Sequence, residues 1–130
     1  MTEPRYRCGI EAVLDLLGGK WKILIIYHLR GSQARFGDLR RMVGKISEKV
    51  LSQQLKEMVA DGLVQRIDFH TVPPHVEYHC TDFGLDLCAT LKDVCDWGTL
   101  NMEELNAVAQ AREARSSKAA SARAFAAGTV

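Results

Sequence analysis

Residues 35–66 read RFGDLRRMVGKISEKVLSQQLKEMVADGLVQR, which predicts two short helices around a tight turn and then the start of a strand. The second helix has apolar residues spaced by three or four, so one of its faces is expected to be buried: Ile46, Val50, Leu51, Leu55 and Met58. Its other face carries hydrogen-bond donors and a net positive charge: Lys49, Ser52, Gln53 and Lys56. A helix of this kind suits the major groove of DNA.

The chain has 130 residues and a net charge of +1, which is enough length for one domain with a real core. The charge is unevenly distributed, because residues 1–66 hold 12 Lys/Arg and 7 Asp/Glu whereas residues 67–130 hold 5 and 9. A basic first half can turn a positive face toward phosphates, and a dimer would double the number of contacts. The charge pattern therefore permits DNA binding without proving it.

Two more helices are predicted before this stretch, at residues 10–17 and 20–30, and the first short helix within it is predicted at residues 36–43. The helix over residues 20–30 is apolar on most of its circumference, which predicts a central position in the core. Ser47 stands where a helix N-cap belongs, and Asp61-Gly62 is expected to end that helix near residue 60. Gly44-Lys45-Ile46 would form the turn between the two short helices.

Two strands are predicted after these helices, at residues 63–69 and 76–80, joined by a tip that contains Pro73 and Pro74. Thr81 would cap a last, long helix. That helix carries small and apolar residues at alternating spacings of three and four: Cys88, Leu91, Cys95, Gly98, Met102, Leu105 and Ala109. Such a seam is too long for one small core, so it predicts a partner helix. We expect a folded domain over residues 1–114 and a flexible Ala/Ser-rich tail over residues 115–130.

This order of elements predicts a mainly α fold with a two-stranded β-hairpin wing, namely a winged helix-turn-helix domain. The chain resembles the HxlR-type transcriptional regulators, relatives of the MarR group. The resemblance runs from Cys8 to about Trp97 and is carried by LGGKWKILIIYHL (17–29), residues 35–66, and VPPHVEYHCT (72–81).

The resemblance implies a homodimeric, sequence-specific DNA-binding regulator, with repression preferred over activation. The N-terminal helix and the long C-terminal helix would pair the subunits through a set of apolar residues: Ile10, Val13, Leu14, Leu91, Cys95, Met102 and Leu105. It also implies that an N-terminal cysteine senses quinones, aldehydes or oxidants in some members. That cysteine is Cys8 here, with Gly9 in place of the usual proline. A symmetric dimer predicts an inverted-repeat operator whose half-sites lie about one helical turn apart.

The candidate DNA contacts fall into three groups. On the second helix of the motif, contacts to base edges or nearby phosphates are expected from Ser47, Lys49, Ser52 and Gln53. Lys56 is expected to contact phosphate. On the helix before it, phosphate contacts are expected from Arg40 and Arg41. On the wing, contacts to phosphate or the minor groove are expected from Arg66, His70, Thr71 and His75. The alternatives are an ordinary solvated helix face and a plain surface hairpin.

Cys8 is the candidate redox site. Arg7 and the start of the first helix both favour its thiolate, which an oxidant or a small electrophile would modify. The alternative is a small apolar filler at the subunit interface. Core packing is favoured for Cys88 and Cys95. Cys80 is a conceivable disulfide partner of Cys8, although the sequence does not place the two near each other.

Other function classes have weaker support. His75, His79 and Cys80 lie close in sequence and suggest a metal-responsive regulator, but no compact metal-binding motif occurs, so no metal or cofactor is predicted. A winged helix that binds only proteins is a further alternative. An enzyme is not expected, since neither a glycine-rich phosphate loop nor a Gly-x-Ser-x-Gly elbow is present. The start of the chain reads as an amphipathic helix, and a cytoplasmic protein without membrane contact is expected.

Overall fold

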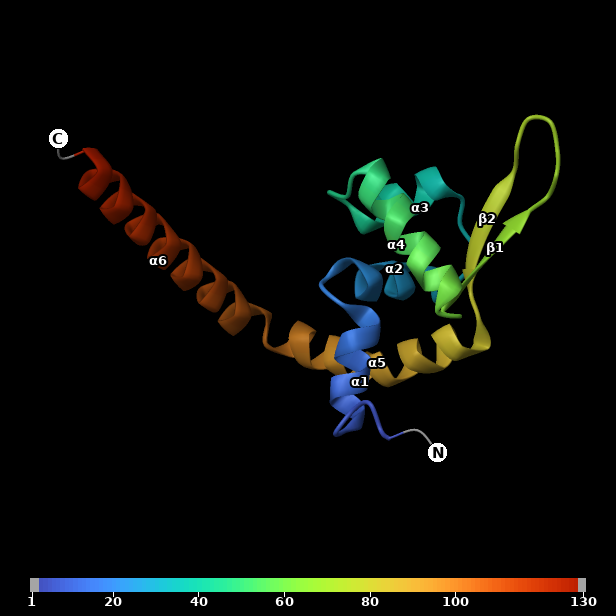
Figure 1. Cartoon of the computed structure of the whole chain (residues 1–130), viewed down its shortest axis with the longest axis horizontal. Helices are drawn as coiled ribbons and strands as arrows, with labels where there is room; N and C mark the ends of the chain where they lie inside the picture. Colours follow the sequence, from blue (N-terminus) through green and yellow to red (C-terminus); the bar gives the residue numbers. More distant parts are fainter. Residues whose placement is uncertain (1–2, 129–130) are drawn as a thin grey trace. The chain divides into compact units, whose positions relative to one another are not determined.

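The computed structural model describes residues 3–128, and these residues form six helices and two strands (Figure 1). The elements in chain order are α1 (Gly9–Leu17), α2 (Trp21–Leu29), α3 (Phe36–Val43), α4 (Glu48–Ala60), β1 (Val64–Asp68), β2 (Val76–Cys80), α5 (Asp82–Leu100) and α6 (Met102–Gly128). The chain divides into two compact units, one that extends to Thr90 and one that starts at Leu91.

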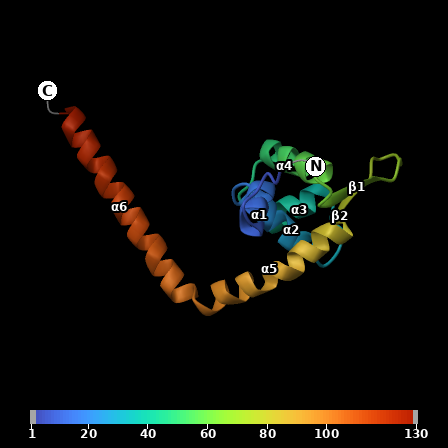
Figure 2. The ribbon, with the colours of Figure 1, turned by 60° about the horizontal axis from the view of Figure 1, so that its bottom comes forward.

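The core of the first unit lies around α2, as the apolar circumference of that helix predicts. Its fully buried side chains come from α2, α3, α4 and the start of the hairpin: Ile25, Ile26, Leu29, Leu39, Leu51, Leu55, Met58, Leu63 and Val64. α2 packs against both α3 and α4, and within this unit the hairpin projects away from the helices (Figure 2). The helix-turn-helix is therefore held from behind by α2.

The hairpin is an antiparallel pair in which Val64 faces Cys80 and Asp68 faces Val76. A short bridge on the other side of β2 joins Ala34 to Tyr78, with N···O distances of 2.9 and 2.8 Å. The segment before α3 thus fastens the hairpin to the helix-turn-helix. The sequence did not predict this bridge, because a single paired residue leaves no periodic pattern.

The start of α5 is tied closely to the start of the hairpin. Thr81 caps the helix as predicted, because its Oγ1 accepts from the Gly84 N–H at 3.0 Å. The same hydroxyl donates to the Gly62 carbonyl at 2.5 Å, and the Thr81 N–H donates to the Leu63 carbonyl at 3.1 Å. Gly84 is buried against this strand: a Cβ atom on Gly84 would lie 2.2 Å from the Leu63 carbonyl oxygen. Only glycine fits there.

The predicted elements of the first unit are confirmed, with small shifts at their ends. α1 starts one residue earlier than predicted, at Gly9, and α2 is shorter at both ends than the predicted 20–30. The first strand covers Val64–Asp68 and not the full predicted 63–69. Gly62 follows α4 with φ 78°, the left-handed conformation expected of a glycine at a helix end.

The predicted single long helix is wrong, because the structure contains two helices, α5 and α6, that meet at Asn101. The Asn101 side chain donates to the Trp97 carbonyl at 2.8 Å, and the Asn101 carbonyl accepts from the Leu105 N–H at 2.9 Å. An asparagine that competes for backbone groups in this way favours a helix boundary over a helix interior. Asn101 therefore ends one helix and starts the next.

Residues 115–128 continue α6, whereas the sequence suggested a flexible tail. Alanine is abundant in this segment and is the best helix former, which explains a helix where no core is present. No described residue of α6 is buried. The domain boundary after residue 114 stays a prediction.

Candidate nucleic-acid interface

The turn between α3 and α4 is held by an arginine. Arg40 Nε donates to the Ile46 carbonyl at 3.0 Å, and its guanidinium lies 3.4 Å from Glu48 Oε1. Ile46 is 3 % exposed and anchors the turn in the core, while Gly44 takes φ 103°. Arg40, predicted as a phosphate contact, is thus half-buried, and its guanidinium donates hydrogen bonds to groups within the helix-turn-helix.

The first turn of α4 is capped as predicted. Ser47 has extended backbone angles, φ −75° and ψ 156°, and its Oγ accepts from the Val50 N–H at 3.1 Å. The acidic residue in this turn, Glu48, is paired with Arg40. The N-terminus of α4 is therefore well ordered, and Ser47 itself remains exposed.

The outer face of α4 is open to solvent along its length. Leu51, Leu55 and Met58 are at most 1 % exposed on the inner face. On the other side, three predicted contact residues are exposed: Lys49, Gln53 and Lys56. The fourth, Ser52, is half-buried at the edge of this face. We call Lys49, Ser52, Gln53 and Lys56 the reading face. The predicted division of α4 into an apolar and a donor-bearing face is thus present in the structure.

Behind the reading face lies a hydrogen-bonded chain that the sequence did not reveal. Lys22, on α2, is the buried charged residue of the core, and its Nζ lies 2.7 Å from Glu57 Oε2. The other oxygen of Glu57 accepts from Gln53 Nε2 at 3.1 Å. The hydrogen bond from Lys22, and after it the one from Gln53, hold the pKa of the Glu57 carboxyl below its usual value. The available signal was a lysine inside the apolar segment KWKILIIYHL.

Three of the predicted wing residues are exposed: Arg66 on β1, and His70 and Thr71 at the tip. His70 adopts φ 54°, and its N–H donates to Asp68 Oδ1 at 2.8 Å. Thr71 Oγ1 donates to the Pro73 carbonyl at 2.9 Å. These local bonds shape the tip and leave the His70 ring outside.

The fourth predicted wing residue, His75, contacts other side chains of the hairpin. Its ring stacks on Phe69 with centroids 4.4 Å apart, and its Nε2 lies 3.0 Å from Glu77 Oε1. His75 is half-buried, so it has less freedom to meet DNA than the tip residues. The structure gives it a clear role in stabilising the base of the tip.

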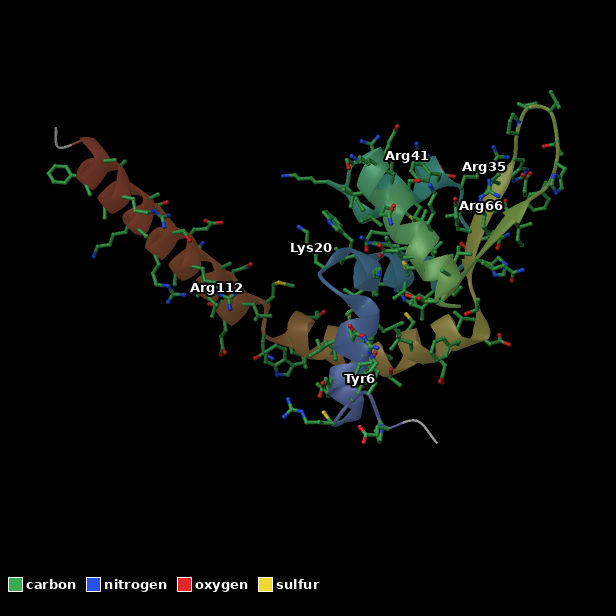
Figure 3. All side chains as sticks on the ribbon, viewed as in Figure 1. Tyr6, Lys20, Arg35, Arg41, Arg66 and Arg112 are labelled. Atoms are coloured by element: carbon green, nitrogen blue, oxygen red, sulfur yellow. The ribbon has the colours of Figure 1, made fainter. Side chains whose placement is uncertain are left out.

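Basic side chains mark the rest of the surface next to the reading face. Arg41 is exposed near the α3–α4 turn and pairs with Asp38, and Arg66 lies on the neighbouring hairpin (Figure 3). Arg35 is exposed where α3 begins and was missed by the sequence analysis. A shallow hollow beside the turn is lined by Arg40, Arg41, Gly44, Lys45, Ile46 and Ser47.

Cys8 occupies the N-cap position of α1 and is exposed, as its place in the sequence predicted. Its basic neighbour Arg7 is paired with Glu11, with Nε 3.6 Å from Oε2, so part of its positive charge is offset. The segment is fastened to the helix by Tyr6, whose hydroxyl donates to Asp15. Cys8 is thus exposed on a segment that is hydrogen-bonded to α1.

The other three cysteines differ in burial. Cys80 and Cys88 are each 7 % exposed, and each thiol donates to the Ile26 carbonyl at 3.9 Å. Burial, and after it the neighbouring Cys88, raises the pKa of the Cys80 thiol to about 11. The prediction that Cys88 packs in the core is confirmed. Cys95 is exposed, so core packing within its own chain is wrong for that residue.

Each unit has exposed apolar residues in the predicted dimer set. In the first unit Ile10 and Leu14 are 70 % and 68 % exposed on α1, and Val13 beside them is half-buried. In the second unit the predicted residues are exposed or half-buried: Leu91, Cys95, Met102 and Leu105. Further apolar side chains on α5 are exposed that the sequence pattern did not indicate: Val94, Trp97 and Leu100.

Two further features concern residues 3–128. Within this part of the chain, no group of three or more His, Cys, Asp or Glu side chains is arranged to hold a metal ion. None of its helices combines the length and the apolar character that crossing a membrane requires.

The chain is similar to known transcriptional regulators over most of its length. It is 41 % identical over 98 residues to the HTH-type transcriptional regulator YtcD of Bacillus subtilis, covering 75 % of this chain and 78 % of YtcD. It is 51 % identical over 89 residues to the HTH-type transcriptional regulator BH0655 of Halalkalibacterium halodurans, covering 68 % and 79 %. The solved structure of the redox regulator HypR in its reduced form superposes with a TM-score of 0.72 at 39 % identity, covering 77 % of this chain and 99 % of that one.

The family model for the HxlR-like helix-turn-helix matches residues 16–106, which include α2, the helix-turn-helix, the hairpin and α5. The exposed reading face of α4 and the wing belong to this matched region. The chain therefore belongs to the HxlR-like helix-turn-helix family and is a transcriptional regulator of the winged-helix type.

Proposed function

We propose that the protein is a homodimeric repressor that recognises an inverted-repeat operator. Each subunit would place the reading face of α4 in a major groove and its wing beside it. The observation that carries the proposal is the reading face itself: Lys49, Gln53 and Lys56 are exposed, while Leu51, Leu55 and Met58 on the opposite face of α4 are buried. The proposal places the protein in the cytoplasm, where bacterial chromosomal DNA lies.

The proposed DNA contact of each residue on the reading face depends on its position along α4. Lys49, Ser52 and Gln53 lie in its first half and would meet base edges, because the N-terminal part of a recognition helix lies deepest in the groove. Lys56 lies further along and would meet phosphate. Arg41, Arg66, His70 and Thr71 would add phosphate or minor-groove contacts from the two sides. Arg40 would contribute mainly by holding the turn.

The direct test is selection of genomic DNA fragments by the purified protein, followed by binding measurements over a series of salt concentrations. We expect an inverted repeat with half-sites about one helical turn apart. Lys56→Ala should weaken binding to all sequences equally and reduce the slope of log affinity against log salt by about one unit per subunit. Lys118→Ala, on α6, is the matched control and should leave the slope unchanged. Binding that is indifferent to salt, or fragments without a shared site, would contradict the proposal.

The exposed apolar residues of α1 in the first unit, and of α5 and α6 in the second, each support the dimer. Large apolar side chains such as Ile10, 70 % exposed, and Leu100, 85 % exposed, are unfavourable in water, and several of them on one helix indicate an interface. The matched HypR structure is named a redox regulator, and Cys8 is an exposed cysteine at the N-cap of α1, the helix that carries Ile10 and Leu14 of the proposed interface. We therefore assign the redox switch to Cys8, with oxidation or addition of an electrophile at its thiol as the signal.

This assignment makes a prediction about thiol oxidants. Treatment of the parent protein with diamide or a quinone should lower operator affinity, and Cys8→Ser should remain in the DNA-binding state under the same treatment. Cys95→Ser is the matched control, because it removes the other exposed thiol and should respond like the parent; since Cys95 belongs to the proposed interface, the mass of this variant in solution is compared with that of the parent first. The measurement is operator binding before and after treatment, with the mass of the modified peptide. Equal loss of binding in the parent and in Cys8→Ser would exclude Cys8.

A further inference from the structure

Gln53 does not extend freely from the reading face. Its side-chain nitrogen donates to Glu57 Oε1 at 3.1 Å, one helical turn further along α4. One of the two amide N–H groups is thereby occupied, and one N–H and the amide oxygen remain for a ligand. A neighbouring donor and acceptor are the pair that a glutamine uses to recognise adenine in the major groove.

Glu57 is itself held in place from inside the protein. Its Oε2 accepts from Lys22 Nζ at 2.7 Å, and the Lys22 side chain is 11 % exposed. Charge-assisted hydrogen bonds of this kind are short and directional, and they are stronger than bonds between neutral groups. Both bonds are stronger to the ionised carboxylate, in agreement with the lowered pKa of Glu57. The order of the chain from core to surface is Lys22, Glu57, Gln53.

The geometry points to Lys22 and Glu57 as positioning residues that orient the Gln53 carboxamide for base recognition, so that α2 contributes to operator specificity. The inference deepens the proposed function and rests on it, because Gln53 must face DNA for its orientation to matter. A free glutamine side chain loses rotamer entropy when it is ordered. Here much of that ordering precedes DNA binding, and the amide has one preferred face toward the groove.

A second consequence concerns charge. A carboxylate on this side of α4 would repel phosphate if it were unpaired, and the Lys22 ammonium offsets it at short range. Lys22 therefore has two effects. It helps to orient Gln53 through Glu57, and it offsets the negative charge of Glu57 beside the reading face. The alternative is an ordinary surface pair between residues four apart on a helix, which would have no influence on base preference.

The experiment compares base discrimination in four proteins: the parent, Gln53→Ala, Glu57→Gln and the double variant. Discrimination is the ratio of dissociation constants for the selected operator and for operators with single base-pair changes. Gln53→Ala should lose discrimination at one base pair per half-site, on the order of tenfold. Glu57→Gln should lose a large part of the same discrimination at the same base pair. In the Gln53→Ala background it should have no further effect on discrimination.

Controls separate orientation from folding and from charge. Glu57→Gln keeps the shape of the side chain, and its thermal unfolding is measured alongside. Lys22→Met, which removes the buried ammonium, should reproduce the loss of discrimination if the variant remains folded. Glu103→Gln removes an equal charge from α6 and should leave discrimination at the parent value.

The outcomes distinguish this inference from the proposed function. A parent protein that discriminates, together with a folded Glu57→Gln that discriminates equally or binds all operators equally more weakly, overturns the inference alone. A Gln53→Ala variant with unchanged discrimination also overturns it, and leaves DNA binding by the other residues intact. A parent without any sequence preference overturns both.

Discussion

Gly84→Ala is expected to destabilise the first unit by about 3 kcal/mol, at the upper end of typical overpacking costs. The new Cβ would lie 2.2 Å from the Leu63 carbonyl oxygen and 3.4 Å from a methyl group of Ile26. The obstacle is backbone that already accepts from the Thr81 N–H, so it cannot move without breaking that bond. α5 would have to shift away from the hairpin. With such a cost, Tm should fall by roughly 10–25 °C.

The matched control is Gly37→Ala on α3, where the new Cβ would meet only an Arg41 side-chain nitrogen, at 3.9 Å. Alanine is a better helix former than glycine by up to about 1 kcal/mol, so this variant should be as stable as the parent or more stable. The measurement is thermal or denaturant unfolding of both variants. If Gly84→Ala unfolds at the parent temperature, the close approach of α5 to Leu63 is not rigid.

Leu14→Glu is expected to convert the protein to monomers and to lower operator affinity on the order of 100-fold or more. Leu14 is 68 % exposed, so a carboxylate at this position should change the free energy of unfolding of the single chain very little. Two such carboxylates at a symmetric interface would lose water and repel each other. The second half-site would then bind as an independent molecule, without the gain from a high effective concentration.

Mass in solution, by sedimentation or light scattering, and operator affinity are measured together for this variant. Leu14→Met keeps an apolar side chain at the same place and should remain dimeric with parent affinity. The affinities of the parent and of Leu14→Glu should differ less for a DNA fragment with one half-site than for the full operator. A Leu14→Glu protein that stays dimeric and binds the full operator as the parent does would exclude α1 from the interface.

Much of the fold follows from local sequence patterns. The spacing of Leu51, Leu55 and Met58 predicted the buried face of α4, and Ser47 and Gly62 predicted its two ends. These signals are local, because capping and helical periodicity depend on residues within two turns of each other. The break at Asn101 was missed for the opposite reason. The apolar seam continues through it, and one side chain that bonds to a backbone carbonyl leaves no trace in that period.

The exposure of the candidate contact residues was predicted only in part. The sequence placed Lys49, Gln53 and Lys56 on one exposed face, and the structure has them exposed. Arg40 and His75 were treated as equals of the other contacts. The structure commits Arg40 to the turn and His75 to the hairpin. Burial and internal partners of polar residues depend on packing, and a pattern of residue types does not report them.

The sequence by itself determined the order of the elements and which face of each helix is apolar, because residues close along the chain set both. The tertiary structure alone decided which distant residues meet. It paired Lys22 of α2 with Glu57 of α4, bridged Ala34 to Tyr78, and brought Gly84 against Leu63. Each of these contacts joins segments whose approach is set by the packing of the whole core, so no local pattern encodes it.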